Sequence, residues 1–301
     1  MTLANAAQLQ QEGPVTSNSV IFEERRRCYW SIILLRRLLG WPIEASNHKT
    51  PLPPFPDSPS SPQADAMSPE GNRVAADPSF RDGIVSTVIV LSKAWSLAQD
   101  YVRSRGTSER NIPPWSPEST YGTSMQMLLS LGKEFSPLHR YRHLRLSSVT
   151  SEELEKSRAY WAPWFLSRFL YHTLLCLINH PLLITLQFQG SEHVSELFLQ
   201  QTAYLASHHT AWILHFIEYI ETKGFYVTDP LIGYCAAVIA TIELQQSFTE
   251  DRDHHEKRRG NYERCLSFIQ RLGKDWQYNQ RLVSSSTNCL PLLRSDKYLR
   301  D

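Results

Sequence analysis

The chain of 301 residues lacks paired cysteines, glycine-rich loops and an excess of charge of either sign. Its five cysteines, at positions 28, 176, 235, 265 and 289, include no closely spaced pair. This spacing argues against a cysteine metal cluster or a disulfide framework, and it predicts a reduced intracellular compartment. Only twelve residues are glycine, and no GxGxxG, GxxxxGK[ST], HExxH or GxSxG motif occurs. We therefore expect no enzymatic activity and no resident cofactor.

The charges are almost equal in number. The chain has 31 lysines and arginines and 30 aspartates and glutamates, so its formal net charge is +1. A chain this balanced has no overall field that would hold it on a polyanion. We therefore expect it to reach DNA only weakly or indirectly, through another protein.

One long apolar run, residues 164–188, invites a membrane interpretation. It contains Arg168, His172, Asn179 and His180, which are costly in hydrocarbon, and Pro181, which interrupts a helix. A buried core helix that is kinked or ends before Pro181 explains the run better. We expect no membrane contact.

Helical periodicity runs through most of the chain, and no segment alternates apolar and polar residues between turn signals as a strand would. Thr150 with Glu153, and Asp229 with Pro230, form helix-start signals. The predicted fold class is all-α, an irregular multi-helix domain with one long disordered connector rich in proline and serine. We expect helices over residues 22–39, 79–104, 121–135, 151–178, 193–223, 230–248, 253–272 and 274–283.

Composition divides the chain into five parts. Residues 1–20 are small and polar and predict a flexible N-terminal lead-in, and residues 21–45 hold the first helix. Residues 46–78 are dominated by Pro, Ser, Asp and Asn, so they cannot bury enough apolar surface to offset their ordering entropy and are expected to be a disordered linker. Residues 79–283 form the helical body, and residues 284–301 form a tail.

The first helix has an unusual distribution of apolar residues. Nearly every position from Cys28 to Leu35 is apolar, and charged residues lie toward both ends. A helix that is apolar on most sides is expected to be buried. It needs cover on several sides, from the tail, a second copy of the chain or a partner protein.

Trp164, Arg168 and His172 form a candidate ligand pocket. They stand at i, i+4 and i+8 and would share one face of a helix. Two polar groups beside large aromatic side chains are typical of a small-molecule site. The alternative is ordinary core packing, with the polar ends reaching solvent or a carbonyl.

Two groups of residues have metal-competent side chains. The first is the cluster Asp251, Asp253, His254, His255 and Glu256, which lies among basic residues at a helix start; the second is the i, i+4 pair of histidines at 139 and 143. Solvated charges explain the cluster, and no third ligand stands near the pair. We therefore expect no metal at either place.

Residues 23–42, EERRRCYWSIILLRRLLGWP, join a basic stretch, an aromatic pair, an apolar helix and a turn. In this order they resemble the signature segment of the fungal-specific transcription factor domain, the middle homology region of fungal zinc-cluster regulators. The segment 230–244 is similar to the small-residue-rich helix near the end of that domain. The residues that match the signature are Arg25, Arg26, Arg27, Trp30, Gly40 and Pro42.

The chain also departs from the family pattern. Arg36 and Arg37 stand where the family has Asp-Arg, and Trp41 replaces the arginine of the turn. The six-cysteine zinc cluster that reads DNA in this family cannot be built from five scattered cysteines. The resemblance therefore covers the regulatory domain alone, over about residues 20–275 of this chain.

The resemblance implies a transcription-regulator-like protein that acts in the nucleus on the expression of a metabolic pathway. It would work through a protein partner, as a homodimer or heterodimer, or through a small-molecule effector. Two alternatives remain open. One is a helical small-molecule-binding protein or an enzyme that uses His172 or the cluster Asp251–Glu256, and the other is an inactive truncated regulator or an interaction scaffold.

Overall fold

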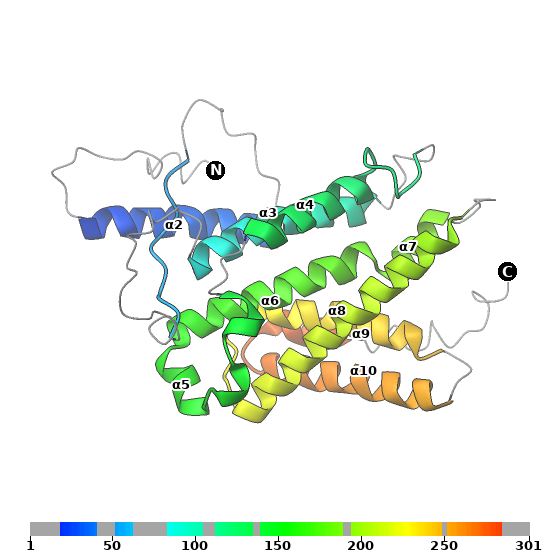
Figure 1. Ribbon diagram of the computed structural model, residues 1–301. Helices are drawn as coiled ribbons and strands as arrows, with labels where there is room; N and C mark the ends of the chain where they lie inside the picture. Colours follow the sequence, from blue (N-terminus) through cyan, green and yellow to red (C-terminus); the bar gives the residue numbers. More distant parts are fainter. Residues whose placement is uncertain are drawn as a thin grey trace. The chain divides into compact units, whose positions relative to one another are not determined.

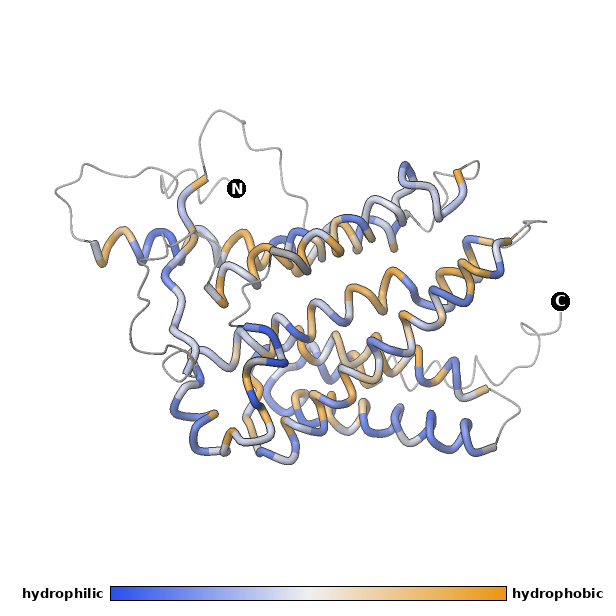
Figure 2. The backbone as a smooth tube through the Cα atoms, in the orientation of Figure 1, coloured by the Kyte–Doolittle hydropathy of each residue, from blue (hydrophilic) through white to orange (hydrophobic). Residues whose placement is uncertain are grey.

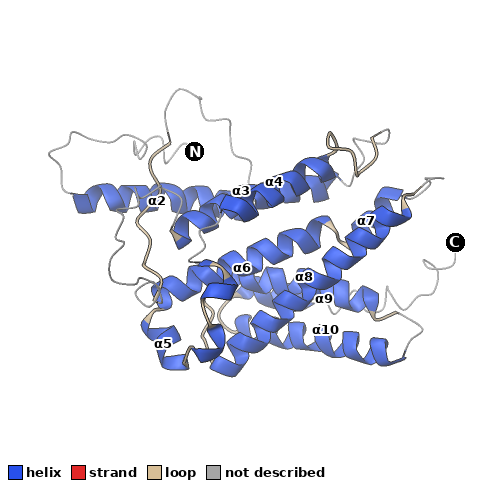
Figure 3. Ribbon diagram, in the orientation of Figure 1, coloured by secondary structure: helices blue, strands red, loops and turns tan. Residues whose placement is uncertain are grey.

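The computed structural model describes residues 19–40, 52–62, 83–104, 112–134, 139–188, 194–248 and 252–284. Within these ranges every regular element is a helix and no strand occurs (Figure 3). The predicted all-α class is therefore confirmed. The predicted lead-in and tail lie almost entirely outside the described residues.

The described residues form two compact units, and three helices contribute residues to both. Figure 1 labels the helices along the chain. The first unit contains the residues up to Asp100 and Ser124–Ser167, and the second contains Tyr101–Thr123 and the residues from Arg168 onward. The division falls inside α3 (Ile84–Ser104), α4 (Thr120–Glu134) and α6 (Arg158–Ile178).

Helix α2 (Ser19–Leu38) opens the first unit and is buried on one side only. Two arginines in its last turn favour the negative end of the helix dipole, and Gly40, with φ 68°, takes the left-handed conformation that follows a helix end. The expectation of burial on most sides was wrong for this helix, since its buried residues are Tyr29, Trp30 and Ile33. Its exposed residues are mixed in character and include Ile21, Glu24, Arg27 and Leu35.

Residues 52–62 form an extended segment, which we call the strap. They belong to the predicted linker 46–78, and the rest of that linker lies outside the described residues. Pro53 and Pro56 of the strap are buried. The Phe55 ring lies 4.9 Å from the Trp30 ring, centroid to centroid, so the strap is packed against α2.

The predicted helix 151–178 is divided in two, α5 (Ser151–Lys156) and α6, by Ser157. The predicted capping box at its start is confirmed. Glu153 N–H donates to Thr150 Oγ1 at 3.2 Å, and Thr150 N–H donates to Glu153 Oε2 at 2.7 Å. The second helix starts again on the carbonyl of Ser157, which accepts from the N–H groups of Tyr160 and Trp161.

The second unit is built from α7 (Pro181–Phe188), α8 (Glu196–Lys223), α9 (Pro230–Gln246) and α10 (Arg252–Leu272), with the end of α6. Helix α9 is buried on nearly all sides, and many of its buried residues are small, among them Gly233, Ala236, Ala237 and Ala240. A Cβ added at Gly233 would lie 2.7 Å from the Asn279 side chain, so only glycine allows this close approach. Helix α10, largely hydrophilic along its length, packs against α9 (Figure 2).

Helix starts and ends in the second unit follow the sequence signals. Leu231 N–H donates to Asp229 Oδ1 at 2.9 Å, and Pro230 occupies the first helical position of α9. Gly224, with φ 62°, ends α8. Helix α6 ends at Ile178, and Pro181 begins α7.

The stretch Arg158–Phe188 is long and apolar enough to cross a membrane, judged by length and composition alone, because it contains an apolar window with a mean hydropathy of 1.5. In the structure, 67% of the residues of this 18-residue apolar window are buried. Burial of this extent is also a property of a core helix in a soluble protein.

Candidate functional site

The first unit holds a cavity of about 480 Å³ beside α2, the strap and the start of α3. Pockets that bind small molecules have volumes of ~300–1,000 Å³, so the cavity is large enough for one. We call the cavity and the contacts around it the strap site. Its lining residues are Arg27, Trp30, Ser31, Leu34, Pro56, Asp57, Ser58, Pro59, Val85, Ile89 and Ala159.

Trp30 is the largest apolar side chain that lines the strap site. It is 4% exposed, and it belongs to a buried cluster with Tyr29, Ile33 and Ile89. Its indole N–H donates to the carbonyl of Pro54 at 2.9 Å. The ring therefore holds the strap by an apolar face and by one hydrogen bond to the backbone.

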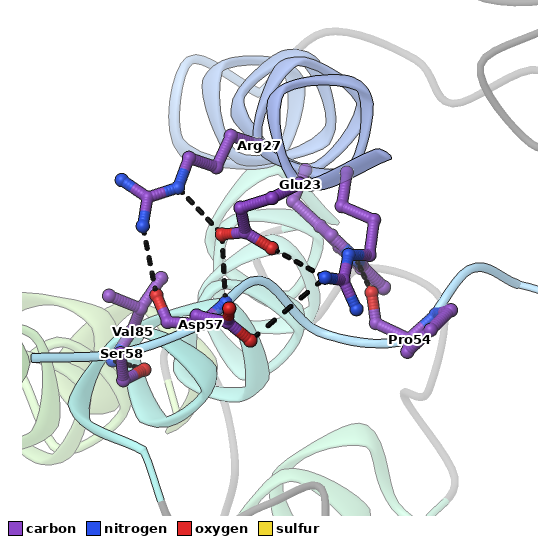
Figure 4. A network of polar contacts seen from close by, with 8 residues as sticks. Glu23, Arg27, Pro54, Asp57, Ser58 and Val85 are labelled. Carbon is purple, nitrogen blue, oxygen red and sulfur yellow. Dashed lines mark hydrogen bonds and ion pairs between the residues drawn. The ribbon is translucent and has the colours of Figure 1, made fainter. Parts of the chain in front are cut away.

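Glu23 organises the polar side of the strap site (Figure 4). Its carboxylate lies 2.8 Å from Arg26 Nη2 and 2.6 Å from Arg27 Nε, and it accepts the N–H of Asp57 at 2.9 Å. Arg27 Nη2 also donates to the carbonyl of Asp57 at 3.4 Å. One carboxylate therefore orients two guanidinium groups and fixes the strap backbone.

Ser58 joins the strap to the start of α3. Its Oγ accepts the N–H of Val85 at 3.2 Å, one of the helix-start donors that lack an intrahelical partner. A Cβ added at Gly83 would lie 2.2 Å from Ser58 Oγ and 2.6 Å from Ser58 Cβ. Glycine at position 83 is what allows the strap to approach α3 this closely.

The structure places three of the six signature residues, Arg26, Arg27 and Trp30, at this site. Arg27 and Trp30 line the cavity, and Arg26 shares the Glu23 carboxylate. Arg25 is partly buried on the same helix, and Gly40 ends α2. Pro42 lies outside the described residues.

The residues of the candidate pocket on α6 fall into different units. Trp164, in the first unit, is fully buried, and its indole N–H donates to the carbonyl of His139 at 2.9 Å. Arg168 and His172, in the second unit, are each 8% exposed. The contacts of Trp164 are those of a core aromatic, while His172 has a polar partner of its own.

That partner is His209 of α8. The Nδ1 atoms of His172 and His209 lie 2.8 Å apart, so one ring donates its proton to the other. Burial, with the nearby His209, Arg168 and His208, lowers the pKa of His172 well below its usual range, and burial with His208 lowers the pKa of His209 to about 4. Both rings are therefore neutral at pH 7, and Trp212 stacks on His172 with ring centroids 5.5 Å apart.

The residues with metal-competent side chains are separated or exposed. His139 is buried and its Nδ1 lies 3.1 Å from the hydroxyl of Tyr160, while the side chain of His143 is outside the described set. Asp253, His254 and Glu256 are exposed at the start of α10. Among the residues that the structure describes, no group of three or more His, Cys, Asp or Glu side chains is placed to hold a metal ion.

A smaller cavity of about 210 Å³ lies in the second unit, between the ends of α8 and α10. The charged groups at its rim have polar partners within the unit. Arg271 forms an ion pair with Glu221, and the Tyr226 hydroxyl donates to Asp275 at 2.8 Å. The volume of this cavity is below the ~300 Å³ of the smallest pockets that usually bind small molecules, so the strap site is the better candidate.

Sequence reasoning found the arginines and the tryptophan of the strap site but missed Glu23, Asp57 and Ser58 as members of a site. The contacts of these residues join positions 27 and 34 residues apart, which local patterns do not reveal. One signal was present: prolines at 53, 56, 59 and 62 recur every three residues. This is the repeat of a polyproline II helix.

Comparison with known proteins found no matching family model, no matching curated protein and no matching solved structure.

Proposed function

We propose that the chain is a regulatory module of the kind that the signature segment resembles, acting in the nucleus on the expression of a metabolic pathway. The observation on which this proposal rests is the 480 Å³ cavity beside α2, which the signature residues Arg27 and Trp30 line. The module works through contacts at this cavity with a small-molecule effector or a protein partner.

The chemistry of the cavity supports an effector that is apolar with one anionic or polar end. Trp30, Leu34, Val85 and Ile89 supply apolar wall, and Arg27 supplies a cationic rim. A ligand that touches both the helices and the strap stabilises the strap-bound form. Such a differential affinity is the physical basis of an effector response.

The DNA-reading part of the regulator is proposed to come from another protein. The net charge is +1, and the five cysteines are scattered through the chain. In a titration with duplex DNA, we expect weak binding that falls steeply with salt, and no stoichiometric zinc in the same preparation. Stoichiometric zinc together with salt-resistant, sequence-selective binding would contradict the proposal.

The regulatory role is tested by fusing the chain to the DNA-binding domain of another protein and measuring a reporter gene. We expect the fusion to change reporter expression several-fold. Ala159→Trp, an exposed rim position on α6, fills the cavity and should reduce the change. Ala203→Trp, at an exposed position on α8, is the matched control and should behave as the parent chain.

The outcome that would overturn the proposal is a fusion with baseline expression, or equal effects of the two alanine substitutions. A scaffold that binds no effector would give equal effects of the two substitutions, because filling its cavity would block no binding.

A further inference from the structure

The strap has the repeat of a proline-rich recognition sequence. Its sequence from residue 52 to 62 is LPPFPDSPSSP, with prolines at 53, 56, 59 and 62. A polyproline II helix has three residues per turn, so prolines at this interval lie along one edge. Pro53 and Pro56 of that edge are buried, while Leu52 and Asp57 are exposed.

The surface beneath the strap has the groups that bind such a segment. An extended proline-rich chain has no internal hydrogen bonds, so its carbonyl groups are free to accept from a partner. Trp30 Nε1 donates to the Pro54 carbonyl at 2.9 Å, and the Trp30 ring packs on Phe55. Aromatic-lined grooves bind proline-rich segments of other chains in this way.

The end of the groove is selective for charge. Asp57 directly follows the buried Pro56. Its N–H and carbonyl are held by Glu23 and Arg27, and its carboxylate lies 4.0 Å from Arg26 Nη2. The carboxylate of an acidic residue at this point lies near one guanidinium group, that of Arg26, whereas a basic residue would meet like charge.

We propose that the groove formed by α2 and the start of α3 is a recognition site for proline-rich segments, and that the strap is its intramolecular ligand. The partner is a protein whose segment has prolines at an interval of three followed by an acidic residue. It binds when it displaces the strap. This inference does not depend on a role in transcription.

A tethered strap competes strongly with a separate peptide. Its effective concentration is on the order of millimolar, so a peptide in trans binds the wild-type chain much more weakly than it binds an empty groove. Weakening the strap without altering the groove should therefore raise the affinity for the peptide.

The test uses a fluorescently labelled peptide of residues 51–62, PLPPFPDSPSSP, and the full chain. The double variant Phe55→Ala/Pro56→Ala weakens the strap, and circular dichroism shows whether its helices are retained. By anisotropy we expect the folded variant to bind the peptide at least ~10-fold more tightly than the wild type. A folded variant that binds no peptide overturns the proposal.

The wild-type chain supplies a second readout that needs no variant. In its NMR spectrum, an excess of unlabelled peptide should shift the amide resonances of Phe55, Asp57 and Ser58 toward those of a released chain. Resonances that stay unchanged at about millimolar peptide, the range in which the tethered strap competes, overturn the proposal.

Two controls separate recognition from nonspecific binding. Trp30→Phe, made in the strap-weakened chain, removes one indole N–H and should weaken peptide binding about fivefold. Trp276→Phe removes a similar bond, to the carbonyl of Thr228 at 3.0 Å in the other unit, and should leave it unchanged. A peptide with Asp57→Lys should bind more weakly than the parent peptide, and equal binding of the two contradicts the assigned selectivity.

Discussion

Glu23 contacts three groups at once, the guanidinium groups of Arg26 and Arg27 and the backbone N–H of Asp57. Its side chain is only 16% exposed, whereas both side chains of the Arg259–Glu263 pair on α10 are more than 60% exposed. Hydrogen bonds to a charged group at such a position contribute more than exposed pairs do. At the scale of single residues, this carboxylate therefore determines whether the strap is held.

Glu23→Gln keeps the shape of the side chain but removes its charge. We expect the free energy of unfolding to fall by ~1–3 kcal/mol in urea titrations, because three donors lose an anionic acceptor. Glu263→Gln is the matched control, since Glu263 pairs with Arg259 at 3.1 Å with both side chains more than 60% exposed. Its effect should stay within ~0.5 kcal/mol, and equal losses in the two variants would contradict the role of Glu23.

Substitution of Gly83 tests whether the strap lies close to the start of α3. Gly83→Ala places a Cβ 2.2 Å from Ser58 Oγ, so we expect a loss of ~1–3 kcal/mol from overpacking. In a Ser58→Gly background the same change should cost much less, which a double-mutant cycle measures. Gly260→Ala on α10 meets nothing within 4 Å and should instead stabilise the chain by up to ~1 kcal/mol. Additive effects of the Gly83 and Ser58 changes would show that the strap does not lie there.

At the scale of a helix, α7 depends on the histidine that precedes it. Leu182 N–H donates to His180 Nδ1 at 3.3 Å, so the ring carries its proton on Nε2, which lies 3.0 Å from Thr241 Oγ1 of α9. The ring caps α7 and bonds it to α9 at the same time. Burial lowers the pKa of His180 to about 4, so the ring is neutral at pH 7.

The stability of the second unit should therefore fall on acidification. Below pH ~6.5 the unfolded chain takes up a proton on His180 that the folded chain does not accept until about pH 4. The contribution of His180 to the free energy of unfolding is therefore complete above pH ~6.5. Between pH ~6.5 and about 4 it declines by up to ~1.4 kcal/mol per pH unit for each such histidine. His180→Asn, which can still cap α7 but does not titrate, should have a shallower decline in urea titrations between pH 6.5 and 4.

His172 and His209 are present in both proteins. The difference in pH-dependence of stability between wild type and His180→Asn therefore reports on His180 alone. The same slope in the two proteins would contradict the tautomer and the burial assigned to His180.

At the scale of the whole molecule, local patterns predicted the helices better than the site. The capping box at Thr150 and the Asp229–Pro230 start are properties of neighbouring residues, and both are present in the structure. The strap site joins Glu23 to Asp57 and Ser58 to Val85, pairs that only tertiary packing brings together. The average composition of residues 46–78 predicted disorder and concealed the stretch 52–62, where Phe55 and the buried prolines pack against a helix.

The exposed side of α2 predicts self-association. Leu35 is 58% exposed and Leu39 is 51% exposed one turn later, and Ile21 near the start of the helix is 50% exposed. Large apolar side chains exposed on one helix favour association. In sedimentation experiments we expect a concentration-dependent dimer, which Leu35→Glu should weaken while Leu197→Glu, at a 74% exposed position on α8, should not. A monomer at all concentrations would contradict this prediction.

The docking of the strap on α2 underlies both the proposed regulatory function and the proposed recognition of proline-rich segments. The most direct test is amide hydrogen exchange of Asp57, whose N–H donates to Glu23 at 2.9 Å. We predict exchange slowed by on the order of 100-fold relative to an unstructured peptide of the same sequence, with most of this protection lost in Glu23→Gln. Exchange of Asp57 in the wild-type chain at the rate of the free peptide would contradict the account.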